Sequence, residues 1–386
     1  MLKIREQDVE NSKGIADWAA RKFPNGEWTL QEYVRNPATY RGRKFDVRVW
    51  SIVTGIDALR IYTLEHGFAK ISTVDYDPSE EHFSNICMHV KMPLGPKCSA
   101  SKLIKPYPGF TEGDMWESGL QYKEESGVSW KRDIWPQVED QVSIAVVSSL
   151  EKVRDATLAM FDGDSEATKR YKRFVFLSPD FVIDDSGKVF MEEMNTNGFM
   201  VGDTYKDFFP AQESTVLAVR MLGADKYPDS LKYKPSLDRV ISNFCSQHYS
   251  SSLQPNKEGC NSEDVAELEN FVHQEMHAGE WVRSFPPRES DWPGMEKVEK
   301  FWKLYSPGAT KKSAANNGSP SELDLLTWKF IEFRRSVSTK SIGDAIDGVE
   351  LDNEMVEDVL KICVYCREKY KGESKTINYE KRQWWT

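Results

Sequence analysis

Three side chains that carry oxygen atoms, those of Asp180, Glu193 and Asn195, are the group in this sequence best suited to chemistry. Two carboxylates and an amide are ligands of the kind that Mg²⁺ prefers, and Mg²⁺ usually shares such ligands with the phosphates of a nucleotide. The alternative for this stretch alone is the solvated edge of a hairpin, in which the three residues simply face water.

A β-hairpin over residues 174–195 must position this group. Two β-rich segments flank a polar turn that ends in glycine, which is the pattern of two paired strands. If Ile183 pairs with Lys188, the register makes Asp180 and Glu193 diagonal neighbours about 7 Å apart on one face. The hairpin therefore predicts that both carboxylates converge near a strand end.

Residues 43–53 show the clearest alternation in the chain and predict a strand. Lys44, Asp46 and Arg48 fall on one of its faces, and unpaired charge is costly to bury. Two explanations stay open. The face is either exposed with cross-strand ion pairs, or it forms a polyanion site into which Lys44 and Arg48 point while Asp46 orients them. A hairpin partner is expected in residues 59–64.

Other polar segments add weaker signals. The loop 11–15 carries Lys13 and one glycine, and it either cradles phosphate through its N–H groups or only opens a helix. Residues 28–34 have a short strand pattern. Lys70 can reach the same cleft as the charged strand or be solvated. The basic run 169–173 directly precedes the hairpin.

Length and composition indicate a globular protein of two or three domains. The chain has 386 residues, 39% of them hydrophobic, and 12 tryptophans. The net charge of −10 argues against general nucleic-acid binding, which needs a basic surface. No run is long enough for a membrane span, and the first residues lack the apolar core of a signal peptide. A soluble intracellular protein is expected.

The six cysteines are scattered and suggest no disulfide framework. Cys363 and Cys366 have the spacing of zinc ligands, but no second pair accompanies them. They also fall within a helical pattern, so a role in the core is expected.

The remaining segments of the chain predict helices rather than chemically active groups. One helix is expected over residues 130–160, before the hairpin, and another from Ser262. Residues 306–318 have the composition of a linker. Ser319 and Glu322 have the spacing of a capping box, with proline at the first helical position. No internal repeat is present.

Taken together, the motifs resemble the tubulin tyrosine ligase-like family of ATP-grasp ligases, which join an amino acid to a protein tail, often that of tubulin. The resemblance covers about residues 3–210, and it includes the thirteen-residue step from Asp180 to Glu193. Its most specific part is the Lys-Phe-Asp-x-Arg strand combined with the hairpin. The motifs are Gln31-Glu32-Tyr33-Val34, Arg43-Lys44-Phe45-Asp46-Val47-Arg48-Val49-Trp50, His82-Phe83-Ser84-Asn85, Asp180-Phe181 and Glu193-Met194-Asn195-Thr196.

The resemblance implies an α+β fold. An ATP-grasp-type antiparallel sheet with packed helices would occupy residues 1–213, and a mainly helical C-terminal region would occupy residues 214–386. The family carries a further domain ahead of its phosphate-binding lysine, and this chain begins almost at that lysine. Either the chain starts late or the C-terminal region replaces that lobe. Pro179 lacks a ladder donor and suggests that its strand lies at an edge.

The resemblance also implies roles for individual residues. Asp180, Glu193 and Asn195 would hold Mg²⁺ and the phosphates of ATP. The catalytic cations would be Lys44, Arg48 and Lys70, with lysine at 70 where the family often has arginine, which loses the bidentate fork. The nucleotide would be bound by Lys3, Lys13, Gln31, Tyr33, Val34, Asp46 and Asn195.

The activity implied is ATP-dependent addition of glutamate, tyrosine or glycine to an acidic protein tail such as that of tubulin. The partners would be that tail and a free amino acid, with no nucleic acid or membrane, in the cytoplasm and in part on microtubules. Lys97, Lys102, Lys105 and the run 169–173 would supply a local positive groove. The alternatives are an inactive tubulin- or peptide-binding module that retains the fold, and an ATP-grasp ligase acting on a small molecule. The oligomeric state stays open.

Overall fold

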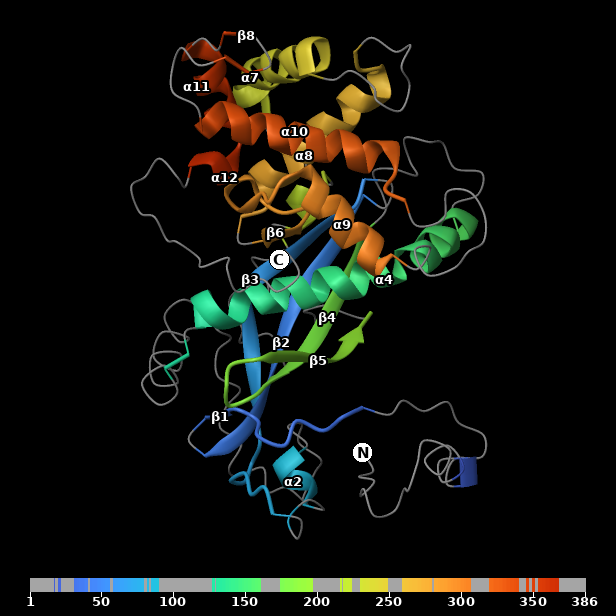
Figure 1. Cartoon of the computed structure of the whole chain (residues 1–386), viewed down its shortest axis with the longest axis vertical. Coiled ribbons are helices and arrows are strands. Elements are labelled where there is room, and N and C mark those ends of the chain that lie inside the picture. Colours follow the sequence, from blue (N-terminus) through green and yellow to red (C-terminus); the bar gives the residue numbers. More distant parts are fainter. Residues whose placement is uncertain are drawn as a thin grey trace.

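The computed structural model describes residues 31–89, 127–160, 174–196, 216–223, 230–248, 259–306, 319–339 and 345–367, with gaps of one or two residues in several of these ranges, together with Asp17, Ala20 and Arg21. This part of the chain is α+β, with an antiparallel sheet and packed helices, as expected (Figure 1). A long helix, α4 (Trp135–Met160), crosses one face of the sheet. Most of the other helices gather at one end of the molecule, while β1 and α2 lie at the other.

The main sheet has the strand order β5-β4-β2-β3-β6, with β1 added beside β2, and every pairing in it is antiparallel. Two short strands, β7 and β8, form a separate hairpin. The strands are β1 (Thr39–Tyr40), β2 (Arg43–Thr54), β3 (Arg60–Ile71), β4 (Phe174–Ile183), β5 (Val189–Asn195), β6 (Trp281–Phe285), β7 (Ala345–Ile346) and β8 (Val349–Glu350).

The predicted hairpin of β2 and β3 is confirmed, and β3 continues as far as Ile71. Gly55 begins the turn with a φ of 60°. A Cβ atom at this position would lie 2.3 Å from the carbonyl oxygen of Ala58, so only glycine fits. The turn sets the register of the adjoining pairs from Ser51–Thr63 to Thr54–Arg60. A register shift between Val49 and Ser51 then separates these pairs from the ones that contain Asp46 and Arg48.

The strand β4 is an interior strand between β2 and β5, so the expectation of an edge at Pro179 was wrong. The β2–β4 pairing keeps one register from Asp46 to Thr54 but lacks pairs opposite Ser178 and Pro179. A proline has no N–H to donate. The sheet therefore accommodates Pro179 through a local gap in one ladder, and β5 forms the edge.

The helices confirm two main expectations from the sequence. The segment 130–160 is helical throughout, as η5 and α4, and α8 begins at Ser262. The elements are α2 (Ile86–His89), η5 (Trp130–Ile134), α7 (Ser230–Asn243), η6 (Phe244–His248), α8 (Ser262–His277), η7 (Glu289–Asp291), α9 (Met295–Tyr305), α10 (Glu322–Thr339), α11 (Asn353–Ile362) and α12 (Val364–Arg367).

The strand β6 comes from the mainly helical C-terminal region but pairs with β3 in the main sheet. The division of the chain at residue 213 stays a prediction. Within the described residues, however, the later region extends the sheet of the earlier one, so the two share a framework.

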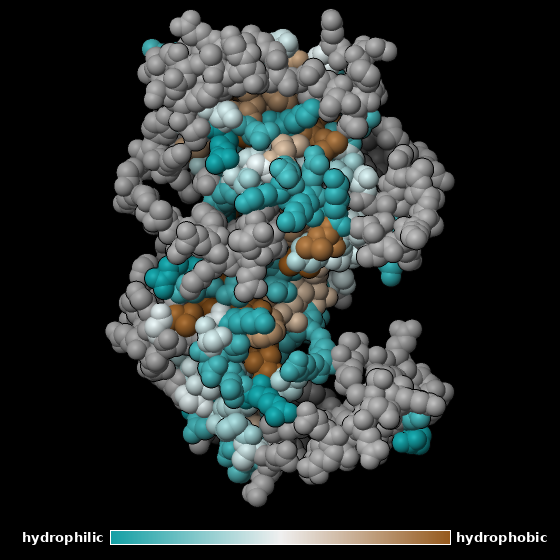
Figure 2. Space-filling model, viewed as in Figure 1, coloured by the Kyte–Doolittle hydropathy of each residue, from teal (hydrophilic) through white to brown (hydrophobic). Residues whose placement is uncertain are grey.

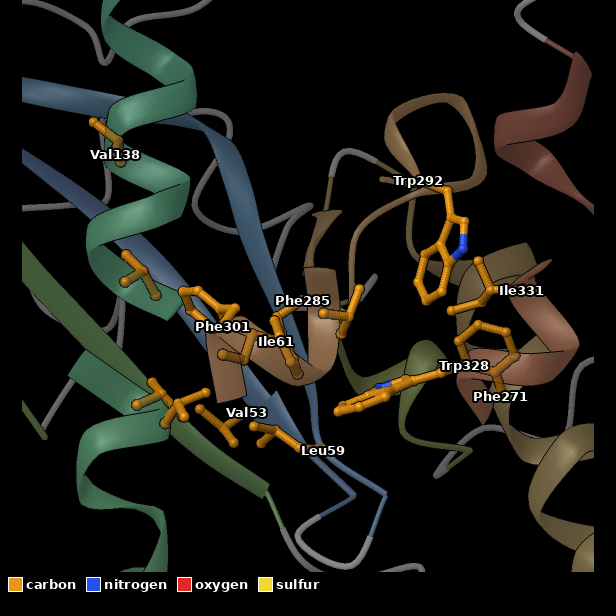
Figure 3. Packing of buried hydrophobic residues seen from close by; sticks show 14 of the residues in the cluster. Val53, Leu59, Ile61, Val138, Phe271, Phe285, Trp292, Phe301, Trp328 and Ile331 are labelled. Atoms are coloured by element: carbon orange, nitrogen blue, oxygen red, sulfur yellow. The ribbon is translucent and has the colours of Figure 1, made fainter. Parts of the chain in front are cut away.

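One apolar core joins the sheet to the helices (Figure 3). Val53 and Ile61 of the sheet lie beside Phe285 of β6, whose ring centroid is 6.2 Å from that of Trp328 in α10. Phe301 of α9 lies 5.7 Å from Phe285, centroid to centroid. Each such fully buried side chain contributes about 1.5–3 kcal/mol to stability. The core therefore couples the helical end of the molecule to the strands.

Two disulfide bonds correct the expectation that the cysteines form no framework. Cys245 is bonded to Cys260, and Cys363 to Cys366, while Cys87 also takes part in a disulfide. The expected core role of Cys363 and Cys366 is confirmed, since both are buried in the apolar cluster. The pair Cys245–Cys260 depends on how η6 meets the start of α8, which sequence spacing does not reveal.

The N-terminus of α10 was expected two residues too early. The helix begins at Glu322, and the capping box is formed by Ser321 and Asp324 rather than by Ser319 and Glu322. The N–H of Asp324 donates to the Ser321 hydroxyl at 3.0 Å, and the N–H of Ser321 donates to the Asp324 carboxylate at 2.8 Å. Pro320 thus precedes the cap.

Replacing Ser321 by alanine is expected to lower the free energy of unfolding by about 1 kcal/mol, because the Asp324 N–H loses its acceptor. Ser319→Ala, two residues earlier and on the exposed side of the cap, is the matched control and is expected to change nothing. Urea unfolding of both variants measures the difference. Equal destabilisation by the two changes would contradict the assignment of the cap.

The outer surface on the face of Figure 2 is mostly hydrophilic where it is coloured, with apolar residues in small separate patches. Within the described ranges, no helix is both long enough and apolar enough to cross a membrane.

Candidate active site

The β4–β5 hairpin brings Asp180 and Glu193 directly opposite each other. The predicted register was wrong: Ile183 pairs with Val189 rather than with Lys188, and a further shift follows between Asp180 and Phe181. That shift makes Glu192 the extra residue of a β-bulge. The two steps together turn the expected diagonal neighbours into a facing pair, so the carboxylates converge more closely than the simple register predicts.

Arg48 of β2 is the cation between these carboxylates. Its Nε donates to Asp180 Oδ1 and its Nη2 to Asp180 Oδ2, each at 2.6 Å. The same Nη2 lies 3.9 Å from Glu193 Oε1. The Asp180 side chain is 2% exposed, whereas that of Glu193 is 60% exposed. A buried, bidentate pair therefore anchors one carboxylate, and the other stays accessible to a ligand.

Asn195 completes the group at the end of β5. Its Nδ2 donates to Glu193 Oε1 at 3.0 Å and lies 3.4 Å from the carbonyl oxygen of Ser178. Because the amide nitrogen makes both of these contacts, the amide oxygen of Asn195 points away from Glu193 Oε1 and from the Ser178 carbonyl oxygen. Asp180, Glu193 and Asn195 thus lie within one small cluster of oxygen donors, as the sequence predicts.

Gln137 of α4 holds the turn of this hairpin, and sequence reasoning missed it. Its Nε2 donates to the carbonyl oxygen of Gly187 at 2.8 Å, and its Oε1 accepts the N–H of Val189 at 3.2 Å. Within the turn, Asp184 accepts the N–H groups of Ser186 and Lys188. No sequence signal marks Gln137, because its partners lie about fifty residues away along the chain.

Lys44 and Asp46 lie on the same face of β2 as Arg48, and both are buried. Burial contradicts the exposed face of the first alternative, whereas the cross-strand ion pair that it included is present between Arg48 and Asp180. The Lys44 ammonium lies 4.9 Å from the centroid of the Tyr33 ring. Burial lowers the pKa of Lys44, and the nearby carboxylate of Glu192 partly offsets this shift. The buried ammonium of Lys44, on the same face as Arg48, is therefore well placed to contact an anionic ligand.

Residues 31–34 run beside this face without forming a strand, so the predicted strand does not extend over them. Gln31 Nε2 donates to the carbonyl oxygen of Glu192 at 3.2 Å, and the Tyr33 hydroxyl lies 3.3 Å from His89 Nδ1. Burial, together with a hydrogen bond to Tyr76, raises the pKa of Tyr33. The segment with Gln31, Tyr33 and Val34 therefore borders the charged residues, and a bulge carbonyl ties it to β5.

The profile of the tubulin-tyrosine ligase family matches residues 5–200, about half of the chain. This chain belongs to the tubulin-tyrosine ligase family. The match covers β1 to β5 and α4, which are the elements that form the charged cluster.

Curated relatives in the family extend the similarity beyond that range. Tubulin polyglutamylase TTLL13 of Homo sapiens is 25% identical over 298 residues, which are 73% of this chain and 34% of that protein. Tubulin glycylase 3C of Tetrahymena thermophila is 26% identical over 204 residues, 51% of this chain and 17% of that protein. Tubulin polyglutamylase ttll-4 of Caenorhabditis briggsae is 24% identical over 222 residues, 54% of this chain and 35% of that protein. The chain spans about a third or less of these relatives.

Several family positions lie outside the described residues. These include Lys3 and Lys13, so the expected phosphate-binding lysine and loop stay predictions. The backbone of Lys70 pairs with Asp46 across β2 and β3, while its side chain is not described. The positive groove also stays a prediction, because it was expected at Lys97, Lys102, Lys105 and residues 169–173. His82 lies in the described part and contacts Asp77, with Nδ1 to Oδ2 at 2.8 Å.

The donor set of this family member suits the divalent cation that the family implies. Carboxylate and amide oxygens are hard ligands of the type that Mg²⁺ takes. The Arg48 guanidinium already bridges Asp180 and Glu193, which shows that a positive charge is favoured between them. The residues that would hold the ion are therefore Asp180, Glu193 and Asn195.

Proposed function

We propose that this chain is an ATP- and Mg²⁺-dependent ligase that joins an amino acid to a carboxylate of a protein tail. The observation that carries the proposal is the facing pair of Asp180 and Glu193, with Asn195 beside it and the cations Arg48 and Lys44 on the neighbouring strand. Membership of the tubulin-tyrosine ligase family supports it, as do relatives named polyglutamylase and glycylase.

The proposed reaction has two steps. The acceptor carboxylate attacks the γ-phosphorus of ATP, forming an acyl phosphate and releasing ADP. The amino group of the incoming amino acid then attacks the acyl carbon, loses a proton and releases phosphate, which leaves an amide. The protein contributes mainly by positioning the partners and stabilising the charge that develops.

The basic and the oxygen-bearing residues of the cluster have different roles in this reaction. Lys44 and Arg48 present cations to the phosphate groups, and Asp46 orients them on β2. Gln31, Tyr33 and Val34 border the adenine. A bound Mg²⁺ would supply neutralisation of phosphate charge, held by Asp180, Glu193 and Asn195. Lys70, Lys3 and Lys13 would add further positive charge.

The proposed acceptor is an acidic tail such as that of tubulin, and the protein would act in the cytoplasm, in part on microtubules. Relatives that add glutamate or glycine leave the identity of the amino acid to experiment. The test is transfer of labelled glutamate, glycine or tyrosine to tubulin, with and without ATP, together with release of phosphate. Transfer that requires ATP is expected. Binding of tubulin without nucleotide binding or transfer would instead identify a non-catalytic module, and transfer to a small acceptor alone would identify a different ligase.

The lowered pKa of Lys44 predicts how nucleotide binding depends on pH. Burial favours the neutral amine. As the pH rises, Lys44 therefore releases its proton before the pH reaches 10.5, the ordinary pKa of lysine. Affinity for an ATP analogue is therefore expected to fall on the alkaline side at a lower pH than an exposed lysine would cause. The free energy of unfolding changes with pH in the opposite direction to the affinity. It rises with pH over the range in which Lys44 titrates, because release of the proton removes a buried charge.

Lys44→Arg is expected to move the alkaline fall to higher pH, because a guanidinium stays charged. Lys188→Arg, at an exposed position in the turn between β4 and β5, is the matched control. Titration of the ATP analogue against each variant across the alkaline range measures the effect. An unchanged profile in Lys44→Arg would show that another group titrates.

A further inference from the structure

The guanidinium of Arg48 lies at the point where the proposed divalent cation would contact its ligands. It takes both carboxylate oxygens of Asp180 at 2.6 Å and approaches Glu193 Oε1 to 3.9 Å. The Arg48 side chain is 19% exposed and that of Asp180 is 2% exposed, so this ion pair lies on the buried side of the cluster. A cation of the protein itself therefore already neutralises Asp180.

A divalent ion has to compete with this pair. A planar guanidinium matches a carboxylate through two parallel hydrogen bonds, and each bond to a charged group changes an equilibrium by about ten- to a hundredfold. An ion bound next to an undisplaced Arg48 would also meet a like charge at short range. The ion must accordingly displace the guanidinium from at least one Asp180 oxygen or bind mainly through the exposed Glu193.

We propose that Arg48 is a place-holder for the divalent cation, so that the free ion binds weakly and is held tightly only together with a polyphosphate. The phosphate oxygens offer the guanidinium a partner with the same bidentate geometry and more negative charge than one carboxylate. Transfer of Arg48 from Asp180 to phosphate then frees the carboxylate for the ion. This inference rests on the proposed function, because it assumes that the cluster receives a nucleotide.

The first test measures Mn²⁺ binding to the full chain without nucleotide, from the free-ion signal in electron paramagnetic resonance. Arg48→Met keeps the length of the side chain and removes its charge, and it is expected to bind Mn²⁺ about tenfold or more tightly than the native protein. Adding Asp180→Asn to Arg48→Met is expected to abolish this gain. Arg43→Met is the matched control on the same strand, because Arg43 forms only a loose pair with Asp75 at 3.6 Å. It is expected to match the native protein.

The second test adds a non-hydrolysable ATP analogue. The analogue is expected to tighten Mn²⁺ binding more in the native protein than in Arg48→Met, because only the native protein has a guanidinium to release. A purely structural role of Arg48 would not produce this difference. Mn²⁺ affinity in Arg48→Met that is equal to or weaker than native affinity would overturn the proposal.

Removing Arg48 also takes a bidentate ion-pair partner from the buried Asp180, so the folding of the variant needs its own measurement. Arg48→Lys keeps a charge but loses the fork, and it is expected to bind Mn²⁺ with intermediate affinity. Thermal unfolding with and without Mn²⁺ gives a second readout: the ion is expected to raise the unfolding temperature more in Arg48→Met and Arg48→Lys than in the native protein. Equal shifts in all three proteins would also overturn the proposal.

Failure of this inference and failure of the proposed function are distinguishable. If the native protein transfers amino acids but Arg48→Met gains no affinity for Mn²⁺, only the place-holder role falls. Arg48→Met can instead gain affinity for Mn²⁺ while the native protein binds no nucleotide and transfers no amino acid. The cluster is then a cation site at which Arg48 competes with the ion, and the ligase proposal falls.

Discussion

Glu193→Gln is expected to reduce amino-acid transfer by on the order of 10²–10³-fold, because it removes the accessible charge of the proposed site. The change keeps the size of the side chain and a hydrogen-bond acceptor for Asn195 Nδ2, which now lies 3.0 Å from Glu193 Oε1. Since the Glu193 side chain is 60% exposed, the free energy of unfolding should stay within about 0.5 kcal/mol of the native value. Transfer of labelled amino acid and urea unfolding together measure the two effects.

Asp185→Asn is the matched control for this prediction. It makes the same exchange of carboxylate for amide on the same hairpin, at an exposed turn position away from the cluster. Its transfer rate is expected to equal that of the native protein. Native-like transfer by Glu193→Gln would mean that the facing carboxylates are not the catalytic centre, whatever the family membership of the chain.

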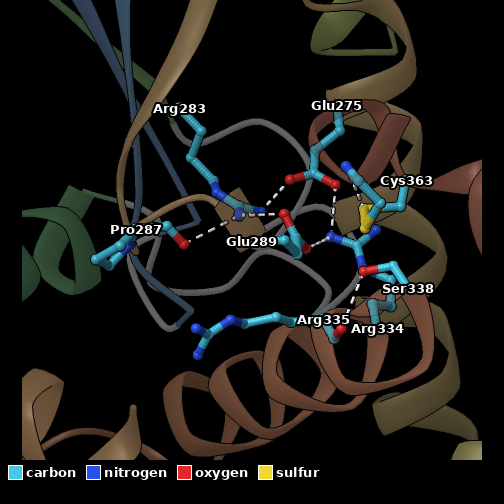
Figure 4. The surroundings of a disulfide bond; sticks show 9 residues. Glu275, Arg283, Pro287, Glu289, Arg334, Arg335, Ser338 and Cys363 are labelled. Carbon is cyan, nitrogen blue, oxygen red and sulfur yellow. Dashed lines mark hydrogen bonds and ion pairs between the residues drawn. A yellow bond between two sulfur atoms is a disulfide. The ribbon is translucent and has the colours of Figure 1, made fainter. Parts of the chain in front are cut away.

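Arg334→Leu is expected to lower the free energy of unfolding by about 3–5 kcal/mol. Arg334 of α10 and Arg283 of β6 are fully buried with the carboxylates of Glu275 in α8 and Glu289 in η7 (Figure 4). Arg334 Nη2 lies 2.8 Å from Glu275 Oε2 and also contacts Glu289, while Arg283 Nη2 lies 2.9 Å from Glu289 Oε2. Removing one arginine leaves two buried carboxylates with a single cation, which is the origin of the cost.

Lys303→Leu provides the matched control, because its ion pair with Glu299 at 3.6 Å is on the surface. Exposed pairs of this kind contribute at most about 1 kcal/mol. Urea unfolding of both variants measures the contrast. If Arg334→Leu were no more destabilising than Lys303→Leu, the buried group would not be what holds α8, β6, η7 and α10 together.

The short-range patterns of the sequence were sufficient for much of the fold. Alternation in residues 43–53 and a glycine turn predict the hairpin of β2 and β3, because strand period and turn chemistry act between neighbours in the chain. The helix over 130–160 follows in the same way from its apolar spacing. The oxygen-bearing group of Asp180, Glu193 and Asn195 was also predicted, since residue type and hairpin geometry are enough to bring it together.

Local patterns in the sequence therefore account for the element types, the family motifs and the chemical nature of the site residues. Tertiary structure alone decided the bulge at Glu192, the pairing of Arg48 with Asp180, the support of the hairpin by Gln137 and the entry of β6 into the sheet. The physical reason is sequence distance. Arg48 and Asp180 are 132 residues apart, so their contact depends on which strands pair and in which register, and no local pattern carries that information.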